Sequence, residues 1–498
     1  MNAFKRLLCL ALALCMCLSL LIACADDTEQ PDDKLPEEPT DEDGGDDGEE
    51  DADPDLLLGL PEMSFGGATF NILCRTDKEY EIDVAEGSTS DTINDAVFAR
   101  NARVEERYDV EIVSIPVNGT WNEQQTFIST LQNAVSAGSQ DFHLVAGYLA
   151  YASSLAMNDC FYNLHEVNNV DFTNEWWSQS FVDNCTIYDC LYFADGDISL
   201  TMWESLYAMF FNKEIADAHG INNLYELASD GEWTMEELYS ITEDFYEDNG
   251  NDAVDEEDLF GLVTNCHSMR ALVTTCGIPI TERNDDGGYD LVFFGEKTVN
   301  LFDEVYSYVH DNDGVYMMVL SDDSDYSDIL KMFTGGRSLF ITGTLDQSAK
   351  LRNMETNFGI LPFPKYDEEQ EEYLSHSYDG HSIFAVPSSL LNPDMSGMIM
   401  EALGAESRYS VIPKYYDVVL KGRTTRDDES QEMLDIIRQN LFFDFGFVHS
   451  VYLDRIYSHF GDLIENGSNT FVSSHVASED KYNTRLEEVM DAYLGLTE

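Results

Sequence analysis

Oxygen-bearing side chains recur at nearly alternate positions in the segment EDNGNDAVDEEDLFG, residues 247–261. On the template of a calcium-binding EF-hand loop, six of these residues fall at positions 1, 3, 5, 7, 9 and 12, and the residue at position 7 contributes a backbone carbonyl. They are Glu247, Asn249, Asn251, Ala253, Asp255 and Asp258. However, Asp252 stands where the sharp turn needs glycine, and Asp258 is shorter than the usual bidentate glutamate. These departures favour a charged surface loop, with a structural calcium ion as the alternative.

A cysteine ends the most apolar stretch of the chain. Lys5 and Arg6 precede the run 7–23, which stops at Cys24 and is too short for a typical membrane span. The ending Leu-Ile-Ala-Cys resembles the lipobox of bacterial lipoproteins, in which the cysteine thiol receives a diacylglyceryl group before cleavage. The sequence therefore predicts a lipoprotein signal peptide over residues 1–23 and a lipidated Cys24 held at a membrane by its acyl chains. The alternative is an uncleaved anchor, or an ordinary signal with an incidental cysteine.

Acidic residues dominate the segment after this cysteine. Residues 25–55 contain 17 of the 96 Asp and Glu residues and almost nothing apolar, so they cannot bury enough surface to offset their ordering entropy. Residues 24–57 are therefore predicted to be the lipidated cysteine and an acidic, disordered linker. Because the formal net charge is -70, the rest of the chain is strongly negative as well. Such a surface repels phosphate backbones and no basic stripe compensates, so we expect no nucleic-acid partner.

Motifs of known catalytic sites are missing from the sequence. It contains no G-x-S-x-G, HExxH or Walker loop, and no Cys/His cluster at zinc spacing. A glycosidase would need two carboxylates across a sugar, and so acidic a chain offers too many pairs to choose between. A surface-anchored glycosidase therefore stays open as an alternative. A modular adhesin is less favoured, because the sequence shows no internal repeat.

Six cysteines remain beyond the predicted signal and Cys24: Cys74, Cys160, Cys185, Cys190, Cys266 and Cys276. Cys185 is close enough in sequence to pair with Cys190, and Cys266 with Cys276. Isolated thiols packed as small hydrophobic side chains are the other interpretation.

Strand and helix patterns alternate along the body of the chain, residues 63–498, whose length favours two lobes. ATFNILC (68–74), DVEIVSI (109–115) and DFHLVAGY (141–148) are typical of strands, and residues 92–108 and 121–139 of helices. This alternation predicts an α/β fold with a parallel sheet between helices. Because ligands of open sheets sit beyond the carboxyl ends of the strands, Ala146, Gly147 and Tyr148 are expected at the edge of a cleft.

The order of these segments resembles that of the extracellular solute-binding proteins of ABC importers, family 1, which includes maltose-binding protein and other oligosaccharide receptors. The resemblance covers nearly the whole body. It rests on the first strands and on four later segments: LYFADGDISLTMWESLYAMFFNKEIADAHGI (191–221), DGEWTMEELYSITEDF (230–245), MFTGGRSLFITGT (332–344) and FGILPFPKYDEEQEEY (358–373).

The resemblance implies a two-lobed periplasmic-binding-protein-like fold of type II, with a hinge and an interlobe cleft. The chain would cross between lobes near residues 197–208, 378–385 and 438–445. Lobe one would then comprise 63–200 plus 382–438, and lobe two 205–380 plus 442–498. A ligand would bridge the lobes, and closure would present a surface to a membrane permease.

A sugar presents apolar C–H faces and hydroxyl groups, so its site needs aromatic rings beside carboxylate, amide and guanidinium groups. On the resemblance, three segments offer such ligand-binding residues besides Tyr148: the first crossing, the segment TNCHSMR (264–270) and the second crossing. The residues are Trp203, Glu204 and Tyr207, then Asn265, His267 and Arg270, then Tyr378, Asp379 and His381. Each also has a purely structural interpretation, as a packed aromatic ring, a hydrogen-bonded core histidine or a turn cap.

One departure concerns specificity. Where maltose-binding protein has an indole after its Asn-Gly-Pro, this chain has Gly343, Thr344 and Leu345, so maltose specificity does not carry over. Trp176 and Trp177 are interpreted as packing within lobe one.

The sequence thus predicts a solute receptor of an ABC importer, with no enzymatic activity and no required cofactor. Its ligand is expected to be a carbohydrate, with peptides and other small polar solutes as alternatives. Its expected partners are the permease and, through the lipid, the outer face of the bacterial cytoplasmic membrane. The receptor is expected to be a monomer.

Overall fold

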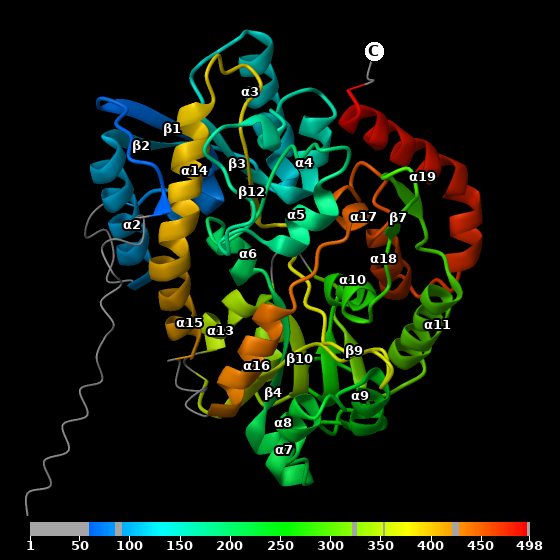
Figure 1. Cartoon of the computed structure of the whole chain (residues 1–498). Coiled ribbons are helices and arrows are strands. Elements are labelled where there is room, and N and C mark those ends of the chain that lie inside the picture. Colours follow the sequence, from blue (N-terminus) through cyan, green and yellow to red (C-terminus); the bar gives the residue numbers. More distant parts are fainter. Residues whose placement is uncertain (1–58, 85–91, 321–325, 352–353, 421–427, 496–498) are drawn as a thin grey trace, which may run out of the picture. The chain divides into compact units, whose positions relative to one another are not determined.

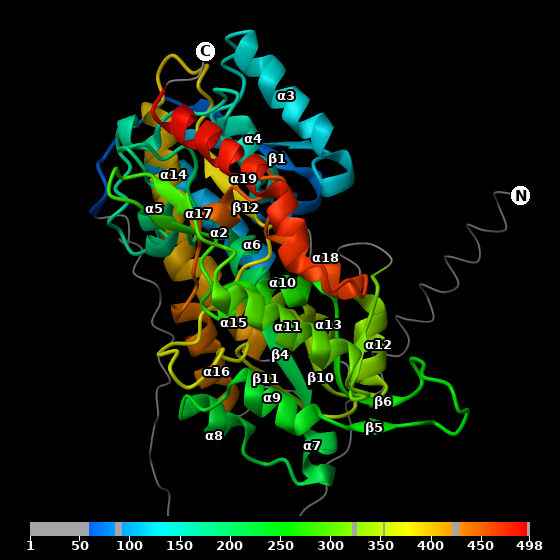
Figure 2. The same ribbon diagram turned by 90° about the vertical axis from the view of Figure 1, so that its right-hand side faces the viewer.

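Two β-sheets flanked by helices organise the computed structural model of the chain, which describes residues 59–84, 92–320, 326–351, 354–420 and 428–495. One sheet occupies the upper part of Figure 1 and the other the lower part, and Figure 2 shows both from the side. This is the two-lobed α/β fold that the sequence predicts. The predicted signal peptide, Cys24 and the acidic linker all lie outside the described residues.

The first sheet has the strand order β12-β3-β1-β2. Its strands are β1 (Ala68–Arg75), β2 (Val110–Val117), β3 (Leu144–Tyr148) and β12 (Ser382–Ala385). β1 pairs in parallel with both β2 and β3, so that Leu73 lies opposite Ile115 and Val145, as predicted. β12 runs antiparallel to β3, because the chain reaches it from the other lobe and not through a crossover helix.

Helices α2 (Thr92–Tyr108) and α3 (Gln124–Ser136) connect the three parallel strands, and both coincide with predicted helices. α2 buries one stripe at helical spacing, which includes Val97, Val104 and Tyr108. The other helical elements among residues 59–206 and 382–420 are η2 (Thr76–Glu81), η3 (Trp121–Glu123), α4 (Leu149–Ala156), η4 (Leu164–Glu166), α5 (Gln179–Cys185), α6 (Leu200–Glu204), α14 (Asp394–Glu406), η6 (Ser407–Val411) and α15 (Ile412–Leu420).

The second sheet has the order β11-β4-β10-β6-β5, and β9 also pairs with β6. Its strands are β4 (Tyr207–Asn212), β5 (Tyr246–Glu247), β6 (Leu259–Thr264), β9 (Val315–Met317), β10 (Ser338–Thr344) and β11 (Phe358–Leu361). The parallel arrangement expected from the sequence holds for β6, β9 and β10 but not for β4, which is antiparallel to both neighbours. β4 follows directly on the crossing between lobes, so no crossover helix sets its direction.

The described remainder of the chain is mostly helical. A short hairpin joins β7 (Thr281–Arg283) to β8 (Tyr289–Leu291). The helices are α7 (Lys213–His219), α8 (Leu224–Ser229), α9 (Met235–Thr242), α10 (Cys266–Thr275), α11 (Glu296–His310), α12 (Ser327–Thr334), η5 (Leu345–Gln347), α13 (Ser348–Leu351), α16 (Asp428–Gln439), α17 (Phe445–Val448), α18 (Ser458–Glu465) and α19 (Phe471–Tyr493).

Three segments that connect the two sheets lie side by side. Leu206 pairs with Ser377, and Ser375 pairs with Leu441. Backbone hydrogen bonds reinforce the first pairing, because the amide of Tyr378 donates to the carbonyl of Ser205 at 2.9 Å. The chain therefore crosses near residues 195–206, 375–382 and 440–445. The exact lobe boundaries stay predictions; α16 packs on β11 and α8 of the second lobe, whereas the predicted boundary groups it with the first.

The six cysteines in the described part of the chain are buried free thiols. Of the two interpretations of Cys185, Cys190, Cys266 and Cys276, the structure thus has isolated thiols. Among the described residues, no helix is both long enough and apolar enough to cross a membrane.

Candidate functional site

A cavity of about 690 Å³ lies between the two sheets. Its wall is built from residues at or just beyond the carboxyl ends of β1, β3 and β10, together with residues of the first two crossings. Ligands of open α/β sheets bind beyond the carboxyl ends of the strands, so this cavity is the candidate binding site.

Four aromatic side chains line the cavity: Trp121, Tyr148, Tyr326 and Tyr378. Trp121 begins η3 and Tyr148 ends β3, whereas Tyr326 precedes α12 and Tyr378 lies in the second crossing. Rings therefore face the cavity from both lobes. Trp121 also receives the guanidinium of Arg455 over its ring, with 5.3 Å between the guanidinium carbon and the ring centroid. The cavity wall thus contains an indole, although none stands near Gly343 in the sequence.

Arg75 joins three parts of this wall. Its guanidinium forms an ion pair with Asp77 at 2.5 Å, donates to the carbonyl of Gly380 at 2.6 Å and lies over the ring of Tyr148, 4.3 Å from the centroid. The side chain is buried, and Gly380 belongs to the second crossing. Arg75 therefore fixes the end of β1 and the ring of Tyr148 against the segment that leads into β12.

Glu204 is the carboxyl group of the first crossing that faces the cavity. Burial raises its pKa to about 7, although the charge of Lys78 and a hydrogen bond from the hydroxyl of Tyr80 lower it in part. A carboxyl group with this pKa exchanges its proton near neutral pH, so the charge of the cavity changes over the physiological range.

This pKa predicts a pH-dependent contribution to stability. The folded state keeps the proton of Glu204 up to about pH 7, whereas the unfolded chain loses it near 4.5, so this contribution falls as pH rises between those values. Between pH 4.5 and 8, we expect the free energy of unfolding of the wild type to fall by about 1–3 kcal/mol relative to that of Glu204→Gln. Urea unfolding at both pH values measures this difference, and Glu487→Gln on the exposed face of α19 is the control. If the difference in unfolding free energy between the wild type and Glu204→Gln did not change with pH, the prediction would be wrong.

A smaller pocket adjoins the cavity and shares Trp121, Tyr148 and Tyr378 with it. It is also lined by His267, Arg270 and Asp379, three of the residues proposed from the resemblance. Arg270 forms an ion pair with Asp462, and its guanidinium lies 3.0 Å from Nδ1 of His267. Burial raises the pKa of Asp379, and the positive charge of Arg270 opposes that shift.

His381 lies behind the cavity, although the sequence placed it among the ligand-binding residues. It is fully buried, and its Nε2 forms an ion pair with Asp195 at 2.7 Å. Nδ1 lies 2.7 Å from the carbonyl of Tyr378, which can only accept a hydrogen bond. Burial lowers the pKa of His381, but the carboxylate of Asp195 more than offsets this and raises it. His381 therefore matches the alternative interpretation, a hydrogen-bonded core histidine.

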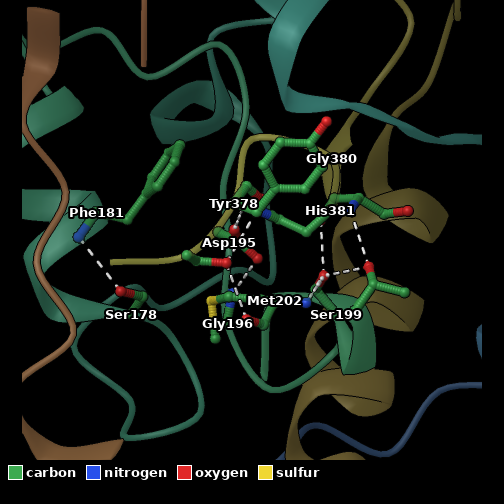
Figure 3. Close-up of polar contacts among 12 residues, drawn as sticks. Ser178, Phe181, Asp195, Gly196, Ser199, Met202, Tyr378, Gly380 and His381 are labelled. Atoms are coloured by element: carbon green, nitrogen blue, oxygen red, sulfur yellow. Dashed lines mark hydrogen bonds and ion pairs between the residues drawn. The ribbon is translucent and has the colours of Figure 1, made fainter. Parts of the chain in front are cut away.

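Figure 3 shows the polar contacts that join Asp195 and Ser199 to the segment of Tyr378, Gly380 and His381. The hydroxyl of Ser199 donates to the carbonyl of Ser382 at 2.7 Å. The hydroxyl of Ser377 donates to the carbonyl of Met202 at 2.9 Å. These contacts hold the first two crossings together.

Three further proposed residues have no place in the cavity wall. The Nε1 of Trp203 donates to Asp197 at 3.0 Å, and Tyr207 stacks on His376. Asn265 is buried and caps α10, where its side-chain oxygen accepts from the amides of His267 and Ser268. Of the ten proposed residues, Tyr148, Glu204 and Tyr378 thus line the cavity, and His267, Arg270 and Asp379 line the adjoining pocket.

Sequence reasoning missed several charged residues of the wall, including Arg75, Asp77, Lys78, Asp346 and Lys350. Arg75 ends β1, as Tyr148 ends β3, and Asp77 and Lys78 follow it in η2. Ligands of open sheets bind beyond the carboxyl ends of the strands, and this rule applied to the first strand predicts that these three residues lie at the cleft. The others follow β10 through η5 and α13, whose positions depend on how that strand pairs.

Hydrogen bonds between its own residues stabilise the loop of residues 247–258. The carboxylate of Asp258 accepts from the amides of Asn249 and Asp255 and from the hydroxyl of Tyr246. Asn251 donates to the carboxylate of Asp255 at 2.8 Å. Within the described residues, no group of His, Cys, Asp and Glu side chains is arranged to hold a metal ion. Calcium binding by this loop stays a prediction.

The fold is that of the solute-binding proteins of ABC transporters, which agrees with the resemblance seen in the sequence. No protein-family model and no curated protein sequence matches the chain. The likeness to solved structures concerns the fold, because the sequence identities are low.

Three solved structures illustrate the likeness. The GacH receptor of Streptomyces glaucescens, solved with acarbose, has a TM-score of 0.53 and 13% identity, over 85% of this chain and 99% of that one. An ABC substrate-binding protein of Listeria monocytogenes in complex with cycloalternan has a TM-score of 0.52 and 12% identity, over 86% and 100%. The maltose-binding periplasmic protein of Listeria monocytogenes, with maltose, has a TM-score of 0.52 and 12% identity, over 88% and 99%.

Proposed function

We propose that the protein is the solute-binding component of an ABC importer and that it captures a carbohydrate in the cavity between its lobes. The observation that carries this proposal is a cavity in which aromatic rings from both lobes stand beside carboxylate, amide and cationic groups. Such a wall suits a sugar, whose ring faces are apolar and whose edges carry hydroxyl groups. The solved structures of the same fold were obtained with saccharides, which supports the proposal.

Ligand contact with both lobes would drive closure. A ligand shifts an equilibrium between open and closed forms only by its preference for one of them. Trp121 and Tyr148 in one lobe and Tyr326 in the other give a bridging ligand more contacts in the closed form. Closure would then present a surface to a membrane permease.

Attachment to the membrane is part of the proposal. The Leu-Ile-Ala-Cys motif supports lipidation at Cys24, followed by the acidic linker. The folded body would then act outside the cell as a monomer, near the outer face of the cytoplasmic membrane. The protein would need no cofactor and would release its ligand unchanged.

A thermal-shift screen against oligosaccharides, peptides and polyols tests the proposed function. A ligand that binds only the folded state adds about 2.7 kcal/mol of stability at a hundredfold excess over its Kd. We expect a shift with an oligosaccharide that is afterwards recovered intact. A shift with only a peptide or polyol would overturn the ligand class, and a shortened oligosaccharide would show a glycosidase.

Replacing the indole in the cavity provides a second prediction. Trp121→Ala should weaken oligosaccharide binding about tenfold, because an aromatic platform contributes about 0.5–1.5 kcal/mol beyond the area it covers. Phe98→Ala, which removes a partly exposed ring on α2 outside the cavity, should leave the Kd unchanged. Calorimetric titration measures both variants. Equal affinities of Trp121→Ala and the wild type would place the sugar elsewhere.

A further inference from the structure

Basic residues are scarce in this chain but gather at the cavity. Lys and Arg make up 26 of its 498 residues, against 96 Asp and Glu. Among the sixteen described residues that line the cavity, three are basic: Arg75, Lys78 and Lys350. The adjoining pocket adds Arg270 and Arg455. The cleft therefore differs in charge from the rest of the molecule.

The cavity wall pairs its three basic residues with three acidic ones, Asp77, Glu204 and Asp346, so its formal charge is zero in a strongly negative chain. Asp77 is engaged by Arg75, which contacts it through two nitrogen atoms. The Glu204 carboxyl, whose pKa is about 7, carries only part of a negative charge at neutral pH. Neither Lys78 nor Lys350 forms an ion pair with a described residue, although the charge of Lys78 acts on the buried carboxyl groups of Glu204 and Glu81. Among the residues of the cavity wall, Asp346 and the partly protonated Glu204 are thus the carboxyl groups left to balance these two ammonium groups.

The two lysines lie on different lobes. Lys78 is in η2, directly after β1, and Lys350 is in α13, after β10. Their like charges repel each other when the cleft is empty, and a negatively charged group held between them would attract both. An anion would therefore favour the closed form more than a neutral ligand does.

The net charge of the whole protein bears on the charge of the ligand that the two lysines would hold. A protein with a formal charge of -70 repels anions, so an anionic ligand needs cations in the cleft to offset this repulsion. A neutral sugar experiences no such repulsion. At physiological salt the repulsion fades over about 8 Å, so cations inside the cleft control the interaction at short range.

We propose that the ligand is an anionic saccharide, whose carboxylate or sulfate group is held between Lys78 and Lys350. This inference rests on the proposed function and specifies its ligand class. The aromatic rings would contact the sugar faces, and the ammonium groups would form charge-assisted hydrogen bonds with the anionic group.

Titration with matched acidic and neutral probes tests the inference. The probes are uronate oligosaccharides, the same oligosaccharides after reduction of their carboxyl groups, and sulfated oligosaccharides. We expect an acidic probe to bind at least tenfold more tightly than its neutral counterpart; whether uronate or sulfate binds better identifies the anionic group. Lys78→Gln and Lys350→Gln should each weaken acidic binding about tenfold and weaken neutral binding much less.

Lys331→Gln, at an exposed position on α12 outside the cavity, is the matched control for the lost charge and should change the Kd less than twofold. If the neutral probes, or other neutral oligosaccharides, bind as tightly as the acidic ones, the inference is wrong while the proposed function stands. The inference is also wrong if both cleft variants bind the acidic probe like wild type. If no saccharide of either class binds, the proposed function itself is overturned.

Discussion

Asp195→Ala should lower the free energy of unfolding by about 3–5 kcal/mol, the usual cost of breaking a buried ion pair. The substitution leaves the Nε2 of His381 without its partner in a site where neither side chain is exposed to water. The amide of Gly196, which donates to the carboxylate of Asp195 at 2.9 Å, loses its acceptor as well. Urea unfolding of the variant and the wild type at pH 7 measures the loss.

Two control variants distinguish the contribution of the ion pair to stability from the loss of a negative charge and from the loss of hydrogen-bonding groups. Asp217→Ala removes the same charge from an exposed position on α7, and we expect it to change stability by less than about 0.5 kcal/mol. Asp195→Asn keeps an oxygen and an amide that can contact His381, and should cost about 1–2 kcal/mol. If Asp195→Ala were as stable as the wild type, the pair would not contribute to holding the first two crossings together.

Arg75→Met should both destabilise the protein and weaken ligand binding. The methionine fills much of the space but loses the ion pair with Asp77, the hydrogen bond to Gly380 and the stacking on Tyr148. We expect a loss of about 2–4 kcal/mol in unfolding free energy. Because the ring of Tyr148 and the second crossing lose their support, affinity for an oligosaccharide should fall about tenfold or more.

Arg75→Lys distinguishes the geometry of this group from its charge. A lysine keeps the charge but has no planar fork, so it cannot contact Asp77, Gly380 and the ring of Tyr148 together. It should therefore recover only part of the lost stability and little of the lost affinity. If it behaved like the wild type, charge alone would explain the role of Arg75.

Local patterns predicted much of the fold. The helix at Thr92–Tyr108 and the strand at Ala68–Arg75 agree with the residues expected for them, because the helix buries side chains at helical spacing and the strand is a short run that becomes buried toward its end. The direction of β4 could not be predicted in the same way. It depends on how the chain crosses between lobes, and this is set by distant pairings such as Leu206 with Ser377.

The site was predicted only in part, for a related reason. Tyr148 could be placed because it ends a strand, whereas Trp203 and His381 were proposed from their residue types within segments that the resemblance gives as crossings. Whether such a side chain faces a cavity or the core depends on partners far away in sequence. His381 has Asp195 as such a partner, and Trp203 has Asp197 and the neighbouring Tyr416. Lys350 was missed because no local pattern shows that α13 borders the cavity.

The buried thiols make the folded protein suitable for site-specific labelling. A maleimide reacts with exposed thiolates, whereas burial raises the pKa of Cys74, Cys266 and Cys276 to about 12 and keeps all six described cysteines away from solvent. One cysteine introduced on the surface of each lobe would therefore accept a dye while the six described thiols remain unmodified. The separation of the lobes can then be followed by fluorescence energy transfer, molecule by molecule, without first rebuilding the core.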